Sequence, residues 1–127
     1  MTQGYLLDTS VFLRFMDAPE RLPDAVSAIL ADPAARVYVS AVSFFEIAVK
    51  KAMKKAQVPD NLPETVAETG LSILPMTPED AWKTLRLPYH HTDPYDRLLL
   101  AQAATHGLAI VSACDYFDAY AVPVLKI

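Results

Sequence analysis

The sequence predicts an α/β fold in which helices cover both faces of a parallel sheet. Short apolar runs alternate with longer segments whose apolar residues recur at helical spacing, and this alternation is typical of parallel sheets joined by crossover helices. Apolar residues make up 53% of the 127 residues and charged residues 20%, which argues against disorder. The length fits one domain, residues 1–127, with a substantial core.

The first part of the chain predicts one strand and two helices. A strand at residues 5–8 ends in Asp8 and leads into a helix that Thr9 or Ser10 caps. A second helix follows Pro23, because proline is favoured at the start of a helix. The two helices are expected to end near residues 16 and 31.

The middle of the chain predicts a strand and two further helices. Residues 36–40 (Arg-Val-Tyr-Val-Ser) are rich in β-forming side chains and predict the second strand. In residues 41–56 the apolar side chains fall on one side of a helix. Pro63 opens a short helix that Gly70 can end.

The last part of the chain alternates strands with helices in the same way. Thr77-Pro78 starts one helix, and a longer helix starts at Asp93-Pro94 and stops at Gly107. The remaining strands are expected at residues 71–74, 108–112 and 122–125. In parallel sheets ligands bind at the carboxyl ends of the strands, which is where this reading places Asp8, Ser40 and Ser112.

Asp8 and Glu46 are the first two candidate site residues. Asp8 closes an apolar strand, so it is either a metal ligand or a turn and cap residue. Glu46 lies on or beside the apolar stripe of its helix, where an unpaired carboxylate is costly. A metal or a basic side chain would satisfy it, and a capping box with Ser43 is an alternative if the helix starts later.

Asp93, Asp96 and Arg97 form the densest candidate site. Asp93 is a natural N-cap before Pro94, and Asp96 three residues later resembles the second member of a capping box. Alternatively, Asp96 points to the same sheet edge as Asp8, with Asp93 nearby. Arg97 would pair with one of these acids or with a phosphate. Asp115 follows the fourth strand and is either a fourth site acid or a loop residue.

Taken together, these acids lie at or near strand carboxyl ends, and their clustering predicts a cation site. Clustered carboxylates raise one another's pKa unless a cation lies between them. Oxygen ligands of this kind suit Mg²⁺ or Mn²⁺, which bridge to substrate phosphates. Such a metal activates water and offsets charge on a phosphodiester.

Net charge and the distribution of apolar residues limit which partners and which location we expect for the protein. The net charge of −4 does not favour nucleic-acid binding, so positive charge would have to be local. Lys50, Lys51, Lys54 and Lys55 crowd one helix and are either a phosphate-binding surface or a solvated face. No apolar run is long enough for a membrane helix, and the N-terminus lacks a signal peptide. We therefore expect a cytoplasmic protein that does not contact a membrane.

Several motifs, in order along nearly the whole chain, resemble the PIN-domain family. They are Leu6-Leu7-Asp8-Thr9-Ser10, Ser40 with Glu46-Ile47-Ala48, the run from His91 to Ala103 with Asp93-Pro94-Tyr95-Asp96-Arg97-Leu98-Leu99, and Ile110-Val111-Ser112 with Phe117. The Asp-Pro-x-Asp-Arg-Leu-Leu segment followed by Ala-Gln-Ala resembles the VapC toxins of toxin–antitoxin pairs.

The resemblance implies a three-layer α/β/α sandwich and a Mg²⁺- or Mn²⁺-dependent endoribonuclease that cuts single-stranded or loop RNA. It implies Asp8, Glu46 and Asp96 as core acids and Asp93 as an accessory acid. It also implies that the hydroxyls of Ser10 and Ser112 orient acids, water or phosphate. The expected partners are RNA, a second copy of the chain and a VapB-like antitoxin.

One departure from the family pattern concerns the fourth acid. Cys114 stands where that acid belongs, and Asp115 comes one place later. A thiol is a poor ligand for a hard cation. Either the loop shifts to bring Asp115 in, or the site works with three acids plus Asp93, or activity is reduced. The alternative to a nuclease is therefore a catalytically weak PIN-like binding module, and a second rival is a phospho-acceptor domain using Asp8.

Overall fold

The computed structural model describes residues 4–127. Residues 1–3, on which the expectation of no signal peptide partly rests, lie outside the described residues. Within residues 4–127, no helix combines the length and the apolar character needed to cross a membrane.

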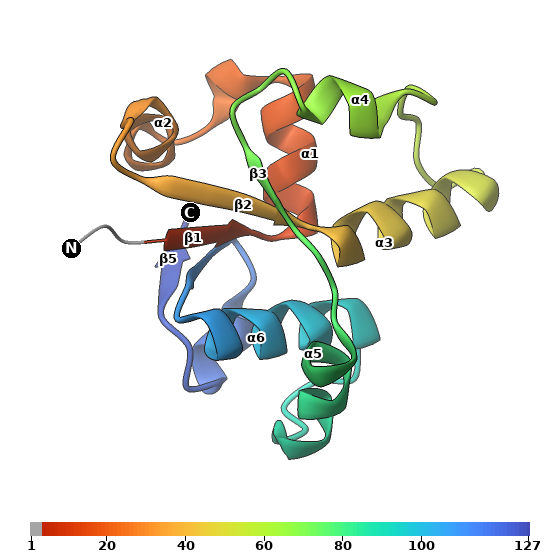
Figure 1. Ribbon diagram of the computed structural model, residues 1–127, viewed down its shortest axis with the longest axis vertical. Coiled ribbons are helices and arrows are strands. Elements are labelled where there is room, and N and C mark those ends of the chain that lie inside the picture. The colour runs from red at the N-terminus through yellow and green to blue at the C-terminus, as the bar shows by residue number, and fades with distance from the viewer. Residues whose placement is uncertain (1–3) are drawn as a thin grey trace.

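The described strands form one parallel sheet. They are β1 (Gly4–Leu7), β2 (Arg36–Ser40), β3 (Ser72–Leu74), β4 (Ala109–Ser112) and β5 (Val124–Lys126). Their order across the sheet is β3-β2-β1-β4-β5, and all four strand pairs are parallel (Figure 1). The predicted α/β fold with a parallel sheet is confirmed, and the strand boundaries differ from the expected ones by at most two residues.

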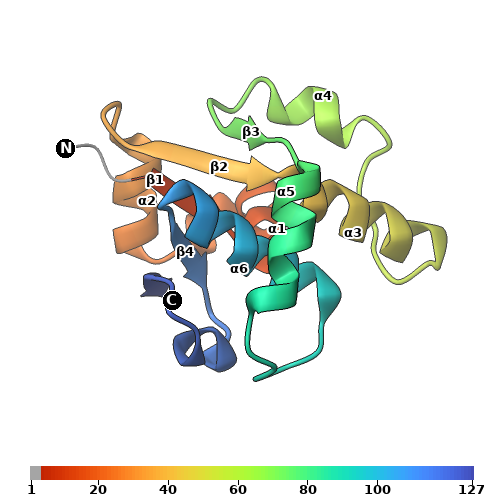
Figure 2. The ribbon, with the colours of Figure 1, turned by 60° about the horizontal axis from the view of Figure 1, so that its bottom comes forward.

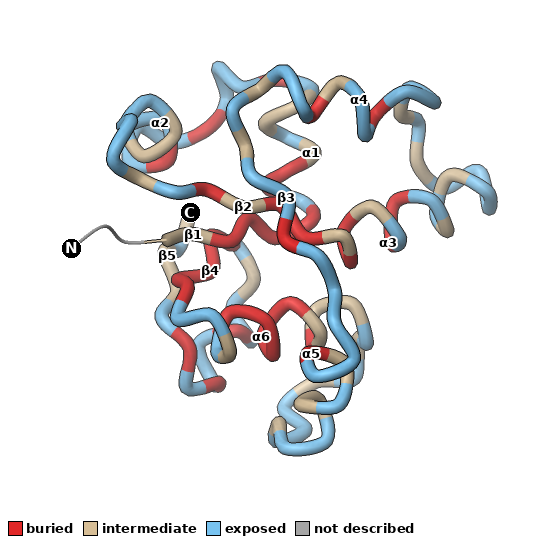
Figure 3. The backbone as a smooth tube through the Cα atoms, in the orientation of Figure 1, coloured by how far each residue is buried: buried red, intermediate tan, exposed pale blue. Residues whose placement is uncertain are grey.

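Helices cover both faces of the sheet, so the fold has the three layers expected. On one face lie α1 (Thr9–Asp17), α2 (Asp24–Ala31) and α4 (Leu62–Val66); on the other lie α5 (Pro78–Lys83) and α6 (Pro94–His106) (Figures 1 and 2). Consecutive residues of β1 serve the two faces: Leu6 packs in the cluster with Leu99, and Leu7 in the cluster with Phe12. The central strands and α6 are accordingly the most buried parts of the chain (Figure 3).

The start of α1 differs from the prediction. Asp8, not Thr9 or Ser10, is the N-cap, because its Oδ1 accepts the N–H of Val11 at 2.7 Å. Thr9 is already helical, and its hydroxyl is hydrogen-bonded to the Ser43 hydroxyl at 2.9 Å. The helix therefore begins immediately after the strand, which fixes the Asp8 carboxylate at the sheet edge.

Helix α3 (Ala41–Ala52) is four residues shorter than expected. Lys54 adopts a left-handed backbone with φ 59°, and the N–H of Lys55 donates to the carbonyl of Lys50 at 2.8 Å. This geometry ends the helix without a glycine. By contrast, α6 ends at Gly107, which has φ 65°, as the sequence predicts.

Three short 3₁₀ helices were not expected from the sequence. They are η1 (Pro19–Arg21), η2 (Thr84–Arg86) and η3 (Asp115–Ala119). Each lasts five residues or fewer, too short for a periodic apolar pattern to identify it.

Helix α5 begins at Thr77-Pro78, as the sequence predicts, and its first turn also contains a capping box. The Thr77 hydroxyl accepts the N–H of Asp80, and the Asp80 carboxylate accepts the N–H of Thr77, both at 3.1 Å. Asp80 is 1% exposed and also accepts a hydrogen bond from the Gln102 amide. Burial favours a higher pKa for Asp80, but the hydrogen bonds from Thr77 and Gln102 outweigh it and lower the pKa.

Replacing Thr77 by alanine is expected to destabilise the fold by about 1 kcal/mol, because one cap hydrogen bond to α5 is lost. Urea denaturation of both proteins measures the difference. The exposed Thr92 supplies the control, since its replacement by alanine should leave stability unchanged. An equal loss in both variants would contradict a specific role for the cap.

Candidate metal centre

Asp8 is held rigidly at the carboxyl end of β1. It is 4% exposed, and besides the N–H of Val11 its carboxylate accepts the Ser112 hydroxyl at 2.5 Å. Ser112 ends β4, the neighbour of β1, so the hydrogen bond joins two strand ends. Burial raises the pKa of Asp8 despite these two hydrogen bonds, and the nearby Glu46 adds to the effect. The Ser112 hydroxyl therefore contacts a candidate acid, and its expected role in orienting that acid stays a prediction.

Glu46 is buried on α3 with one oxygen paired and one not. It is 5% exposed, and its Oε2 lies 2.5 Å from the Lys50 ammonium one turn later. Its Oε1 is buried and has no hydrogen-bond partner among the described residues. The alternative capping box with Ser43 is wrong, because the hydroxyl of Ser40 caps the helix by accepting the N–H of Val42 at 3.0 Å.

Asp93 and Asp96 sit at the start of α6 and do different things. Asp93 is the N-cap, as predicted, and accepts the N–H groups of Tyr95 and Asp96 at 2.8 and 3.2 Å. The Asp96 carboxylate does not complete a capping box; it accepts the Tyr116 hydroxyl at 2.9 Å. Burial, with the charges of Asp93, Glu46 and Asp8, raises the pKa of Asp96 to about 6.

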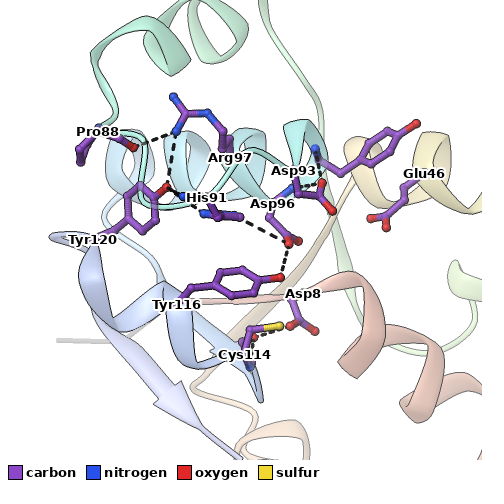
Figure 4. A network of polar contacts seen from close by, with 12 residues as sticks. Asp8, Glu46, Pro88, His91, Asp93, Asp96, Arg97, Cys114, Tyr116 and Tyr120 are labelled. Atoms are coloured by element: carbon purple, nitrogen blue, oxygen red, sulfur yellow. Dashed lines mark hydrogen bonds and ion pairs between the residues drawn. The ribbon is translucent and has the colours of Figure 1, made fainter.

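The four acids face one region beyond the carboxyl edge of the sheet. Figure 4 shows Asp8, Glu46, Asp93 and Asp96 directed toward a shared space between α1, α3 and α6. The charges of Asp8, Glu46 and Asp93 all act on Asp96. In the part of the chain that the structure describes, however, no three such side chains lie close enough to form a ready-made cation site.

The donor chemistry nevertheless fits Mg²⁺ or Mn²⁺. Every acid in the cluster offers hard oxygen ligands, and the unpartnered Oε1 of Glu46 is a buried acceptor that lacks a donor or a cation. Like-charged carboxylates stay apart when no cation lies between them. Asp8, Glu46 and Asp96 are therefore the residues that would hold a divalent cation, with Asp93 beside them.

Asp115 does not join the cluster. Its side chain is 94% exposed and forms an ion pair with Lys126 at 2.5 Å. The option that the loop shifts to bring this acid into the site is therefore wrong for this structure. The residue at the position of the fourth acid in the family pattern is Cys114. Its backbone N–H donates to the Ser112 hydroxyl at 3.0 Å.

Two supporting residues lie elsewhere than expected. Ser10 is exposed on α1, and its hydroxyl makes no hydrogen bond to another side chain or to the backbone of the described residues. Arg97 is 4% exposed and pairs with neither acid; its guanidinium donates to the carbonyls of Pro88, Thr84 and Leu87 at 2.8, 3.0 and 3.2 Å. The expectation that Arg97 binds an acid or a phosphate is wrong, because its donors are used to hold the segment before α6.

The four lysines do not act as one surface. Lys50 pairs with Glu46, and Lys51 donates to the Val58 carbonyl and pairs with Asp60 at 3.2 Å. Lys54 and Lys55 are exposed beyond the end of α3. A phosphate-binding surface at this helix would therefore rest mainly on Lys54 and Lys55.

Sequence reasoning missed the role of Tyr116 beside Asp96. Tyr116 donates to Asp96, and His91 stacks on Tyr116 with 4.3 Å between ring centroids. The Nδ1 atom of His91 lies 2.8 Å from the Tyr120 hydroxyl. No motif pointed to Tyr116, since a tyrosine beside a loop acid carries no spacing signal.

Comparison with known proteins identifies the fold and one family. The family model described as PIN domain matches residues 5–122. A chain of the DNA-bound VapBC complex from Salmonella typhimurium is similar in structure, with a TM-score of 0.72 and 16% identity over 99% of this chain and 98% of that one. The VapBC2 complex from Rickettsia felis gives a TM-score of 0.73 and 12% identity over 98% and 99%.

A third similar structure is the VapBC-5 complex from Mycobacterium tuberculosis. It gives a TM-score of 0.58 and 22% identity over 98% of both chains. No curated protein sequence matches this chain.

Proposed function

The chain belongs to the PIN-domain family, and on that basis we propose that it is a Mg²⁺- or Mn²⁺-dependent endoribonuclease that cuts single-stranded or loop RNA. The observation that carries the proposal is the carboxylate cluster at the carboxyl edge of the sheet, in which Asp8 and Glu46 are buried, Asp96 is largely buried and Asp93 lies beside them. Lys50 pairs with Glu46, but four carboxylates gathered at one edge still repel one another, so the cluster supports a cation-binding role.

The chain's own residues divide the work in this proposal. Asp8, Glu46 and Asp96 hold the cation, and the hydroxyl of Ser112 fixes the orientation of Asp8. A cation bound there would lower the pKa of a water molecule and offset the charge that develops on the phosphodiester. Lys54 and Lys55, exposed beyond α3, offer positive charge to the RNA backbone.

We propose a toxin role in a toxin–antitoxin pair as the setting of this activity. Three of the similar solved structures are VapBC complexes, one of them named a toxin–antitoxin family member from Mycobacterium tuberculosis. On this proposal a VapB-like protein is the inhibitor, the active form is a homodimer, and the protein acts in the cytoplasm.

Incubation of the purified, partner-free protein with single-stranded RNA tests the nuclease activity. Cleavage is expected with Mg²⁺ or Mn²⁺ and not with EDTA, because the acids need a cation to act. The Asp8→Asn variant, purified in the same way, controls for contaminating nucleases. Asp115→Asn is the matched control, since this acid lies outside the cluster and its loss should leave the rate unchanged.

A catalytically weak binding module is the second candidate. Two observations favour it: Cys114 occupies the place of the fourth acid, and Lys50 already pairs with Glu46. Calorimetry with Mn²⁺ separates the two functions. Mn²⁺ binding without cleavage of several RNAs would point to a very selective nuclease whose substrate was missing, and absence of Mn²⁺ binding would favour the binding module.

A further inference from the structure

The Asp96 carboxylate is fixed by a phenol, not by another charged group. The Tyr116 hydroxyl donates to Oδ2 of Asp96 at 2.9 Å (Figure 4). His91 comes within 3.9 Å of the same oxygen through Nε2, which is too far for a hydrogen bond. Within residues 4–127, Tyr116 is thus the side chain whose hydrogen bond holds this carboxylate, and Oδ1 is left for a cation.

The Tyr116 ring is itself braced on two sides. The His91 ring lies 4.3 Å from it at an interplanar angle of 32°, and the Phe117 ring lies 5.4 Å away edge-on. Because Phe117 is fully buried, the ring is tied to the core of the protein.

The brace continues from His91 to α6. The backbone N–H and the Nδ1 atom of His91 both contact the Tyr120 hydroxyl, at 3.3 and 2.8 Å. The Arg97 guanidinium lies 3.5 Å from that hydroxyl. A chain of contacts therefore runs from Arg97 through Tyr120, His91 and Tyr116 to Asp96, linking α6 to η3 and back to α6.

Tyr116 lies close to the position of the fourth acid in the family pattern. It follows Cys114 by two residues, in the segment where the family pattern places a fourth acid. A thiol is a weak hydrogen-bond donor and a poor ligand for a hard cation. A phenol orients a neighbouring carboxylate and adds no negative charge to a cluster that already repels itself.

We propose that Tyr116 is a positioning residue that holds Asp96 in the orientation required to bind the divalent cation. The inference rests on the proposed function, since it assigns a role in that same site. Hydrogen-bond partners of metal-binding carboxylates orient them, and their removal costs roughly 10- to 100-fold in metal affinity or activity.

The Tyr116→Phe variant tests the proposal, because it removes the hydroxyl and keeps the ring that stacks on His91. Isothermal titration with Mn²⁺, without RNA, is expected to show affinity weaker by roughly 10- to 100-fold. In cleavage assays kcat should fall while KM for RNA stays unchanged, since the RNA-binding surface is not altered. The melting temperature of the metal-free variant checks that the fold is kept.

Tyr89→Phe is the matched control. The Tyr89 ring lies over the Arg97 guanidinium at 3.8 Å, but its hydroxyl makes no hydrogen bond to the described residues. Its removal should leave Mn²⁺ affinity unchanged. Equal Mn²⁺ affinity of wild-type protein and Tyr116→Phe would overturn the positioning role.

The outcomes for Tyr116 and for the nuclease activity remain distinguishable. If the wild-type protein binds Mn²⁺ and cuts none of the RNAs offered, the proposed activity fails for those RNAs, and the difference in Mn²⁺ affinity still decides the role of Tyr116. If the wild-type protein binds no Mn²⁺, both proposals are overturned together.

Discussion

Replacement of Asp96 by asparagine is expected to abolish metal-dependent cleavage and to stabilise the metal-free protein. The activity is lost because an amide is a weaker ligand for a hard cation than a carboxylate. The stability rises because burial holds the pKa of Asp96 at about 6, above its ordinary 3.8, so ionisation at neutral pH opposes folding. With a side chain 15% exposed, the expected gain is about 1–3 kcal/mol.

The direction of the pH dependence follows from that raised pKa. Between pH 3.8 and about 6 the folded protein retains a proton on Asp96 that the unfolded chain has released. Folding stability of the metal-free wild-type protein therefore falls as pH rises through this window. The Asp96→Asn variant has no carboxyl group at this position and so lacks this decrease in folding stability. Plots of the free energy of unfolding against pH for the two proteins should therefore separate between these pH values.

Urea denaturation in EDTA over this pH range measures both effects. Glu68→Gln is the matched control, because it removes the same charge from an exposed side chain and should leave stability nearly unchanged. A metal-free Asp96→Asn protein less stable than wild type at pH 7.5 would refute the electrostatic account. Retained cleavage would refute the place of Asp96 in the cation site.

Replacement of Arg97 by lysine is expected to destabilise the fold by about 2–4 kcal/mol, although the charge is kept. The planar guanidinium reaches the carbonyls of Thr84, Leu87 and Pro88 together. A single ammonium group cannot span them, and partly buried carbonyls left without donors are costly. Chemical denaturation measures the loss, and we expect it at every pH because arginine stays protonated.

The exposed Arg86 supplies the control for this prediction. It lies in the same segment, η2, and Arg86→Lys should change stability by less than about 0.5 kcal/mol. A loss of RNA cleavage in Arg97→Lys with unchanged stability would favour the phosphate contact that the structure contradicts.

The order and type of the main elements could be predicted from the sequence because each carries a local signal. Proline and the capping residues mark helix starts, and the β-rich run at 36–40 coincides with β2. Helix ends were less predictable, as Lys54 shows. Its left-handed backbone ends α3 at a residue type that carries no such signal.

The acids of the site were predictable, whereas their supports were not. Asp8, Glu46 and Asp96 stand in recognisable motifs, and the topology brings strand ends together. Arg97 lies in the same motif, yet its guanidinium turns to backbone carbonyls that no sequence pattern marks. Tyr116 and Lys50 likewise act through contacts that depend on the final packing.

The hydrogen bond between Ser112 and Asp8 joins residues that are 104 positions apart. During synthesis, Asp8 and Glu46 emerge long before Asp96 and Ser112 exist. Strand β1 lies between β2 and β4, so it lacks one neighbour until the last part of the chain has been made. A chain that ends before β4 would lack both the second neighbour of β1 and the Ser112 hydroxyl that holds Asp8. The topology thus leaves the acidic cluster without its Ser112 hydrogen bond until translation is nearly finished.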